Sequence, residues 1–91
     1  MRLNKLDKDI KKIIEYNASP AFYPSIKPAD CWFALRTFMQ QHPELIFLIG
    51  GKPHKYWMAT FATKRGIVAK TTNKDEFCCV CELIIKASEQ L

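Results

Sequence analysis

Three strand-like segments separated by two short turns occupy the middle of the chain, and they constrain the fold more than any other feature. The first is the apolar run 45–49, which is followed by the residues GGKP. The second, residues 55–63, alternates two sets of side chains, and the residues KRG separate it from a third segment, 67–71. Connections this short favour antiparallel pairing of successive strands. The sequence therefore predicts a three-stranded antiparallel meander.

The N-terminal segment has the periodicity of an amphipathic helix. Apolar residues recur every three or four positions from Leu3 onward, and charged residues, Asp7 among them, fall on the opposite side. This pattern predicts a helix over residues 4–16 that docks on the rest of the domain. The next stretch, 18–27, is rich in proline, which cannot continue a helix, and we predict a loop there.

Two further helices flank the strands. Pro28 suits the first turn of a helix over residues 28–41, for which Ser25 is a candidate cap. The last helix is expected to follow Thr72 or Asn73 as its cap, since apolar periodicity resumes directly afterwards.

The predicted fold class is α+β: a three-stranded antiparallel meander with helices packed on it, in the order helix, helix, strand, strand, strand, helix. We expect a single domain over residues 1–91, with an N-terminal helix (1–17), a loop (18–27) and a core (28–91). The second and third helices should cover one face of the sheet. The first two strands carry apolar side chains on both faces, so the other face needs a cover that the first helix or a partner subunit could supply.

Composition narrows the class of partner without naming one. The chain has 91 residues and a formal net charge of +5. No apolar run reaches the ~18 residues of a membrane-spanning helix, and the N-terminus lacks the apolar core of a signal peptide. We expect a cytoplasmic protein in a host cell, with reduced thiols and no membrane partner. The charge favours anionic partners, although a lysine-rich face in contact with solvent explains it equally well.

Three of the four cysteines crowd into the last helix. Cys78 and Cys81 could share one metal ion, but a structural zinc site needs four ligands and the sequence offers no second pair. A reactive thiolate at Cys78, near the helix start, is a second alternative. Helical geometry makes Cys79 point away from the apolar stripe. We interpret the cysteines as small buried apolar residues, and we expect no metal, no cofactor and no catalytic residue.

Topology brings one group of cationic residues together. Successive loops of a meander lie at opposite ends, so the loop 50–55 and the connection 70–74 share one end with the starts of two helices. Helix N-termini attract anions through free N–H groups and the helix dipole. A solvated rim of lysines is the alternative, because nearby carboxylates compete for the same N–H groups. The candidate residues for binding an anion or a partner are Lys27, Lys52, His54, Lys55, Lys70 and Lys74.

Three short patterns, PADCWFAL, YWMATF and VCELIIKA, carry a resemblance to a known family. Together they resemble the phage ABA-sandwich domain and the related NinX-type family of small phage and prophage proteins. The resemblance covers residues 25–87, and the cysteine cluster and the charged first helix depart from it. It implies a phage origin, a layered fold of helices and strands, and an accessory role during infection, with no catalytic residues to carry over. The matching positions are Trp32, Trp57, Ala59, Cys79, Cys81 and Ala87.

Two functions follow as expectations. The first is a small non-enzymatic phage or prophage accessory protein that acts by binding a host or phage protein, for example to inhibit a host enzyme or defence system. The alternative is a nucleic-acid-binding module, because the order helix, three antiparallel strands, helix resembles that of double-stranded-RNA-binding domains. A homodimer is left open.

Overall fold

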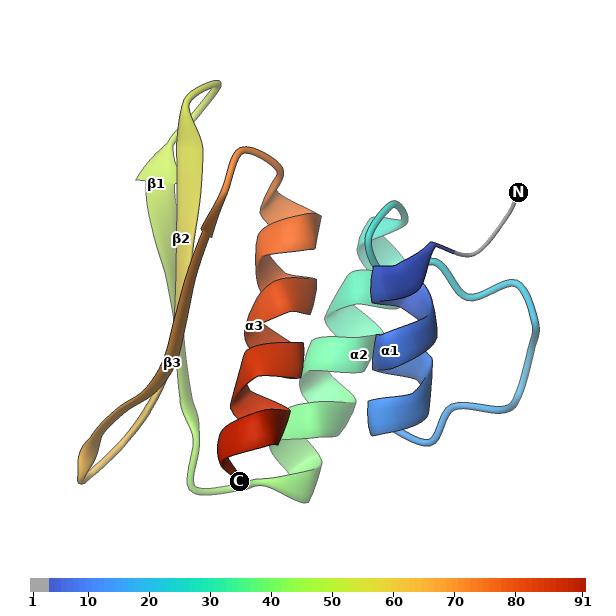
Figure 1. Cartoon of the computed structure of the whole chain (residues 1–91), viewed down its shortest axis with the longest axis horizontal. Helices are drawn as coiled ribbons and strands as arrows, with labels where there is room; N and C mark the ends of the chain where they lie inside the picture. Colours follow the sequence, from blue (N-terminus) through green and yellow to red (C-terminus); the bar gives the residue numbers. More distant parts are fainter. Residues whose placement is uncertain (1–3) are drawn as a thin grey trace.

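The computed structural model describes residues 4–91, and its element order confirms the predicted α+β fold (Figure 1). Leu3, which the periodicity assigns to the first apolar stripe, lies outside this range. The elements are α1 (Lys5–Ile13), α2 (Pro28–Gln41), β1 (Ile46–Lys52), β2 (Tyr56–Thr63), β3 (Gly66–Asn73) and α3 (Glu76–Gln90).

The three strands form one antiparallel meander with β2 in the centre. Pairing extends further than the residue pattern predicts. β1 continues to Lys52, which pairs with Tyr56, and β3 continues to Asn73, which pairs with Trp57. The strand ends are therefore set by the partner strand rather than by local apolar alternation.

The turn between β1 and β2 is short and well defined. The Lys55 N–H donates to the Lys52 carbonyl oxygen across 2.9 Å, and His54 has a φ of 68°. Pro53 at the second position and a positive φ at the third are the features of a type II turn. This geometry holds Lys52, His54 and Lys55 at the tip of the hairpin.

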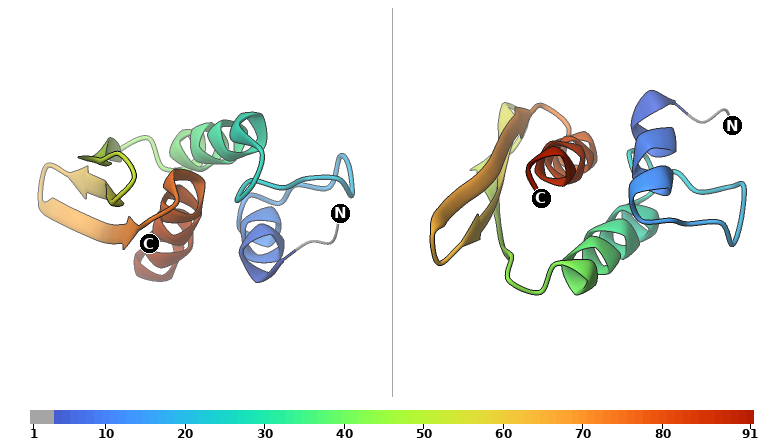
Figure 2. Two further views of the ribbon diagram at one scale, coloured as in Figure 1. Left: turned by 90° about the horizontal axis from the view of Figure 1, so that it is seen from above. Right: turned by 60° about the horizontal axis from the view of Figure 1, so that its bottom comes forward.

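The helices lie on one side of the sheet only, in two layers (Figures 1 and 2). α3 packs directly against β2 and β3, and α1 and α2 pack on α3. α2 also reaches the sheet through Phe38, whose ring centroid lies 5.6 Å from that of Phe61. The expectation that α1 could cover the second sheet face is wrong, because α1 lies beyond α3, away from the strands.

α3 is buried on two sides because it lies between the sheet and the other helices. Cys79 faces the sheet, where its Sγ lies 3.5 Å from the carbonyl oxygens of both Trp57 and Thr71. The prediction that Cys79 points away from the apolar stripe is therefore wrong. Cys31, Cys79 and Cys81 are fully buried and unbridged, as expected for cysteines that act as small apolar residues.

Buried polar contacts fix α1 to the loop before α2. Asn4 is the N-cap of α1 and accepts the Asp7 N–H, while the Asp7 carboxylate accepts the Ser25 N–H across 2.8 Å. Asp7 is fully buried, in contrast to the solvent-facing position predicted for it. Ser25 is likewise not the cap of α2, because its hydroxyl accepts from the Asn4 side chain and Lys27 occupies the cap position.

The remaining helix ends also differ in detail from the prediction. Pro28 does occupy the first turn of α2. The N-cap of α3 is Asp75, whose carboxylate accepts the Cys78 N–H, and Asn73 instead accepts the Asp75 N–H. Within the described part of the chain, no helix combines the length and the apolar character needed to cross a bilayer.

Candidate binding surface

Four of the six predicted site residues lie at one end of the sheet. Lys52, His54 and Lys55 form the hairpin tip, and Lys74 lies in the connection between β3 and α3 at the same end (Figure 1). All four are exposed. The topological argument that joins the two loops is thus correct for these residues.

The other two predicted residues lie elsewhere. Lys70 is in the middle of β3, opposite Thr60, because β3 runs three residues past it. Lys27 begins α2 at the end farther from the sheet (Figure 2), and its Nζ lies over the Tyr23 ring, 5.0 Å from the centroid. The structure therefore does not gather all six residues into one cluster.

The N-termini of α2 and α3 are already partly occupied by carboxylates of the chain. The Asp75 carboxylate caps the N-terminus of α3, and Glu76 adds a second carboxylate in the first turn. At the start of α2, the Asp30 carboxylate accepts the Tyr23 N–H across 2.9 Å. These carboxylates reduce the positive potential that would attract an external anion, so the helix starts are a weak anion site.

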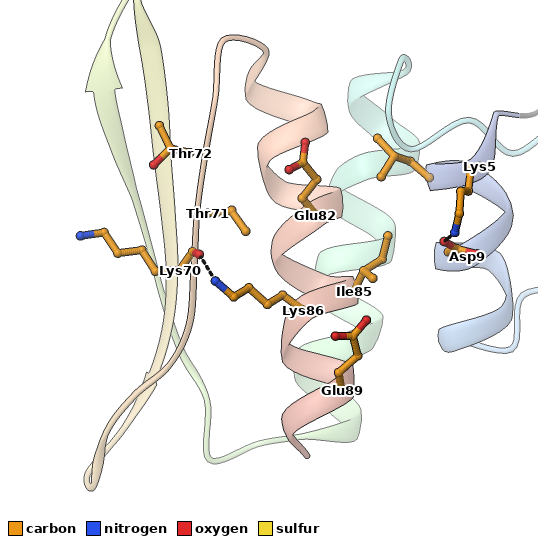
Figure 3. Close-up of a pocket in the computed structure, with 10 residues that line it drawn as sticks. Lys5, Asp9, Lys70, Thr71, Thr72, Glu82, Ile85, Lys86 and Glu89 are labelled. Atoms are coloured by element: carbon orange, nitrogen blue, oxygen red, sulfur yellow. Dashed lines mark hydrogen bonds and ion pairs between the residues drawn. The ribbon is translucent and has the colours of Figure 1, made fainter.

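A better candidate is the outer face of the sheet, meaning the face opposite α3. Cross-strand partners share a face, and Leu48, Thr60 and Lys70 form one row across this one. In Figure 3, Lys70 points away from α3 while Thr71 lies on the side of the helix. The outer face comprises Ile46, Leu48, Gly50, Met58, Thr60, Ala62, Ile67, Lys70 and Thr72.

This face exposes large apolar side chains. Ile46, Leu48 and Ile67 are 53%, 60% and 67% exposed. No element within residues 4–91 packs against them, since all three helices lie on the other side. Contiguous apolar surface of this kind is uncommon on an unpartnered protein and is typical of an interaction site.

The same segment carries the protein's net positive charge. Residues 45–74 contain six lysines and arginines and no aspartate or glutamate, whereas the rest of the chain holds eight basic and nine acidic residues. The sequence alone contains this asymmetry, but it becomes visible only when the positions of the acidic residues are compared with those of the basic ones. The signal is the absence of aspartate and glutamate throughout residues 45–74, which gives the sheet an excess of positive charge.

A groove of about 480 Å³ lies on the outer face near the hairpin tip. Leu48, Met58 and Tyr56 line it together with Lys52. Gly50 keeps it open, because a Cβ at this position would meet no atom within 4 Å. A second groove, of about 630 Å³, lies at the other end of β1 and is lined by residues that include Ile46, Lys64 and Arg65, with Glu44 as its one acidic side chain.

The groove between α1, α3 and β3 is less suited to binding a charged partner (Figure 3). It holds both signs of charge, and several groups are already engaged. Lys5 pairs with Asp9 at 3.1 Å, Lys86 donates to the Lys70 carbonyl oxygen across 3.0 Å, and Glu82 accepts from the Asn73 side chain.

The three thiols of α3 have raised rather than lowered pKa values. Burial, reinforced by the Asp75 carboxylate, raises the pKa of Cys78 to about 11, the opposite of the lowered pKa expected at a helix start. The pKa of Cys81 is also raised, by its hydrogen bond with Cys31 and by burial. Among residues 4–91, no group of three or more histidine, cysteine or acidic side chains is arranged to hold a metal ion.

Comparisons with known proteins give no relative. No family model, no curated protein and no solved structure matches this chain.

Proposed function

We propose that this chain is a non-enzymatic binding protein that recognises an anionic macromolecule through the outer face of its sheet. One observation carries the proposal: an uncovered face with exposed apolar side chains lies on a segment with six basic residues and no carboxylate. Apolar surface supplies binding energy and unpaired cations supply orientation and partner choice.

Binding is favoured over catalysis by the state of the nucleophile candidates. A thiol with a pKa near 11, as at Cys78, is protonated at neutral pH and is a poor nucleophile. His54 is exposed at the hairpin tip, and within residues 4–91 no hydrogen bond or ion pair joins it to a cysteine thiol that it could activate. The surface, rather than a pocket with titrating groups, is therefore the basis for the function.

An accessory role in phage infection forms part of the proposal. The three patterns that resemble the phage ABA-sandwich and NinX-type family support it. A small protein of this kind would act by occupying a surface of a host or phage protein, and a charged apolar sheet face is suited to that. Blocking a host enzyme or defence protein is the form of this role that we favour.

Nucleic acid is the second candidate, because a segment with six basic residues and no aspartate or glutamate also suits a phosphate backbone. The double-stranded-RNA-binding arrangement is matched in that the first hairpin tip and the start of α3 lie at one end (Figure 1). It is opposed by Asp75 and Glu76 at that helix start.

The test is a set of fluorescence-anisotropy titrations of the full chain with labelled polyglutamate, single-stranded DNA and double-stranded RNA. We expect at least one of these polyanions to bind at low salt and to be released by added salt. Lys70→Glu, on the outer face, should weaken that binding by about tenfold. Lys8→Glu makes the same charge change on the exposed surface of α1, away from the sheet, and should leave it nearly unchanged.

Two results would contradict the proposal. One is the absence of binding to all three polyanions at low salt. The other is an equal loss of affinity in Lys70→Glu and Lys8→Glu, which would show that overall charge rather than the outer face is responsible.

A further inference from the structure

The free edge of β1 is the part of the sheet best prepared to take a partner. β1 pairs with β2 on one side only, and within residues 4–91 no backbone group bonds to its other side. An edge strand with unpaired N–H and C=O groups is a template for a further strand. We propose that β1 binds an extended segment of an acidic protein partner, which adds to the sheet as a fourth strand.

β1 lacks the features that normally protect an edge. From Ile46 to Gly51 it contains no proline and no charged residue. The sheet's one register irregularity lies between β2 and β3 instead. Natural proteins protect such edges with charges, prolines or bulges, or cover them with a helix. None of the described helices packs against β1, so the edge is uncovered as well.

Both faces of β1 offer apolar contacts to an added strand. Ile46 and Leu48 are exposed on the outer face, and Phe47 and Ile49 are half-buried on the inner face. Side chains of an added strand would alternate between these two faces and meet apolar neighbours on each. The centre of the bound segment should therefore be apolar at successive positions, which does not suit a nucleic acid.

The charges at the two ends of β1 define what should flank that apolar centre. Lys52 and Lys55 lie at one end, and Lys64 and Arg65 lie near Ile46 at the other. β1 has seven residues and so spans about 24 Å at the rise of an antiparallel strand. The complementary ligand is a segment of about seven apolar or neutral residues with aspartate or glutamate at both ends.

A second copy of this chain fits less well. Antiparallel pairing of two β1 edges would bring Lys52 and Lys55 of one copy towards Lys64 and Arg65 of the other, at both ends of the interface. Like charges placed together oppose association. Glu44, which lies near Lys64 and Arg65 in that groove, is the one acidic side chain among the groove's lining residues, and it lies 3.9 Å from His42.

This inference rests on the proposed function, and the test separates the two. A displayed library of random 12-residue peptides is selected against the immobilised full chain, and enriched peptides are synthesised for binding and hydrogen-exchange measurements. We expect the enriched peptides to share an apolar centre flanked by acidic residues. Bound peptide should slow exchange of amides in residues 46–52, because the added strand bonds to the β1 edge.

Matched charge reversals locate the site. Peptide affinity should fall at least about tenfold when Lys52→Glu and Lys55→Glu are made together. The double variant Lys64→Glu with Arg65→Glu should show the same loss. Lys8→Glu with Lys12→Glu changes the charge equally on exposed positions of α1 and should leave the affinity nearly unchanged.

The inference is overturned if the enriched peptides lack acidic flanks, if exchange in residues 46–52 is unaffected, or if the chain forms a dimer that pairs through β1. If one of these results is found but polyanions still bind and Lys70→Glu still weakens that binding, the proposed function stands and only the added strand at β1 is disproved. If the full chain binds neither the selected peptides nor any of the polyanions, the proposed function is disproved as well.

Discussion

The Asp7 carboxylate accepts the backbone N–H of Ser25 across 2.8 Å, and both residues are buried. This bond joins α1 to the loop before α2, eighteen residues further along the chain. It satisfies a buried N–H group that would otherwise have no water to bond. The second carboxylate oxygen, Oδ2, has no hydrogen-bond partner among the described residues, so the carboxylate is only half compensated.

Asp7→Ala should lower the free energy of unfolding by about 1–2 kcal/mol, because it leaves the Ser25 N–H buried and unpaired. The loss in stability is kept small because the substitution also removes Oδ2, a buried oxygen that has no hydrogen-bond partner among the described residues. Urea denaturation followed by circular dichroism gives the measurement. Asp9→Ala is the control, since it removes only an exposed pair with Lys5 and should change stability by less than about 0.5 kcal/mol. Equal losses in both variants would show that Asp7 acts through helix charge rather than through Ser25.

Glu15 occupies a backbone position that suits glycine. Its φ is 57°, its N–H donates to the Lys12 carbonyl oxygen, and the Tyr16 N–H donates to that of Lys11. This pair of bonds is the Schellman motif, in which glycine is preferred at the left-handed residue. Glu15→Gly should raise the free energy of unfolding by about 1 kcal/mol. Glu15→Ala removes the same charge but keeps the strained φ, so a thermal melt should show stabilisation in the glycine variant alone.

The two adjacent glycines of β1 should respond in opposite ways to substitution. Gly50→Val should raise stability by up to about 1 kcal/mol, because its Cβ enters open space and valine suits a strand. Gly51→Val should lower it by more than about 2 kcal/mol, since its Cβ would lie 2.3 Å from the Tyr56 carbonyl oxygen.

The glycine pair also tests the groove on the outer face. Gly50→Val fills the space beside Leu48 without disturbing the fold. It should therefore lower the affinity for any ligand that enters this groove while the protein becomes more stable. Urea midpoints and peptide or polyanion affinities, measured on the same samples, separate the two effects. A destabilised Gly50→Val variant would contradict the open position of this residue.

Particular residues show where sequence reasoning succeeds and where it stops. The turns at 52–55 and 63–66 are encoded locally by proline and glycine, so the meander and its shared loop end are predictable. Asp7 and Cys79 are not, because their burial depends on a second packing surface supplied by distant segments. A single 3.6-residue period reveals one buried stripe, and α3 has two. The prediction that Lys70 lies in the connection after the third strand fails for a related reason, since the end of β3 is fixed by the pairing of Asn73 with Trp57.

Stability should fall as the pH rises above the ordinary thiol range. Burial and the Asp75 carboxylate raise the pKa of Cys78 from 9.0 to about 11, and the pKa values of Cys79 and Cys81 are raised as well. In the unfolded chain these thiols ionise near their ordinary pKa, whereas in the folded protein Cys78 stays protonated until about pH 11. The unfolded state therefore loses protons first, and its free energy falls relative to the folded state as the pH rises from about 9.

Urea midpoints measured at about pH 8, 9 and 10 should decrease in that order in the wild-type protein. The raised pKa values of Cys79 and Cys81 also contribute, so the informative quantity is the difference between the wild type and Cys78→Ala. The variant should lose less stability over the same interval, because one thiol with a raised pKa has been removed. Parallel pH profiles for the two proteins would mean that the Cys78 thiol ionises equally easily in the folded and unfolded chains, contrary to its position beside Asp75 in a partly buried site.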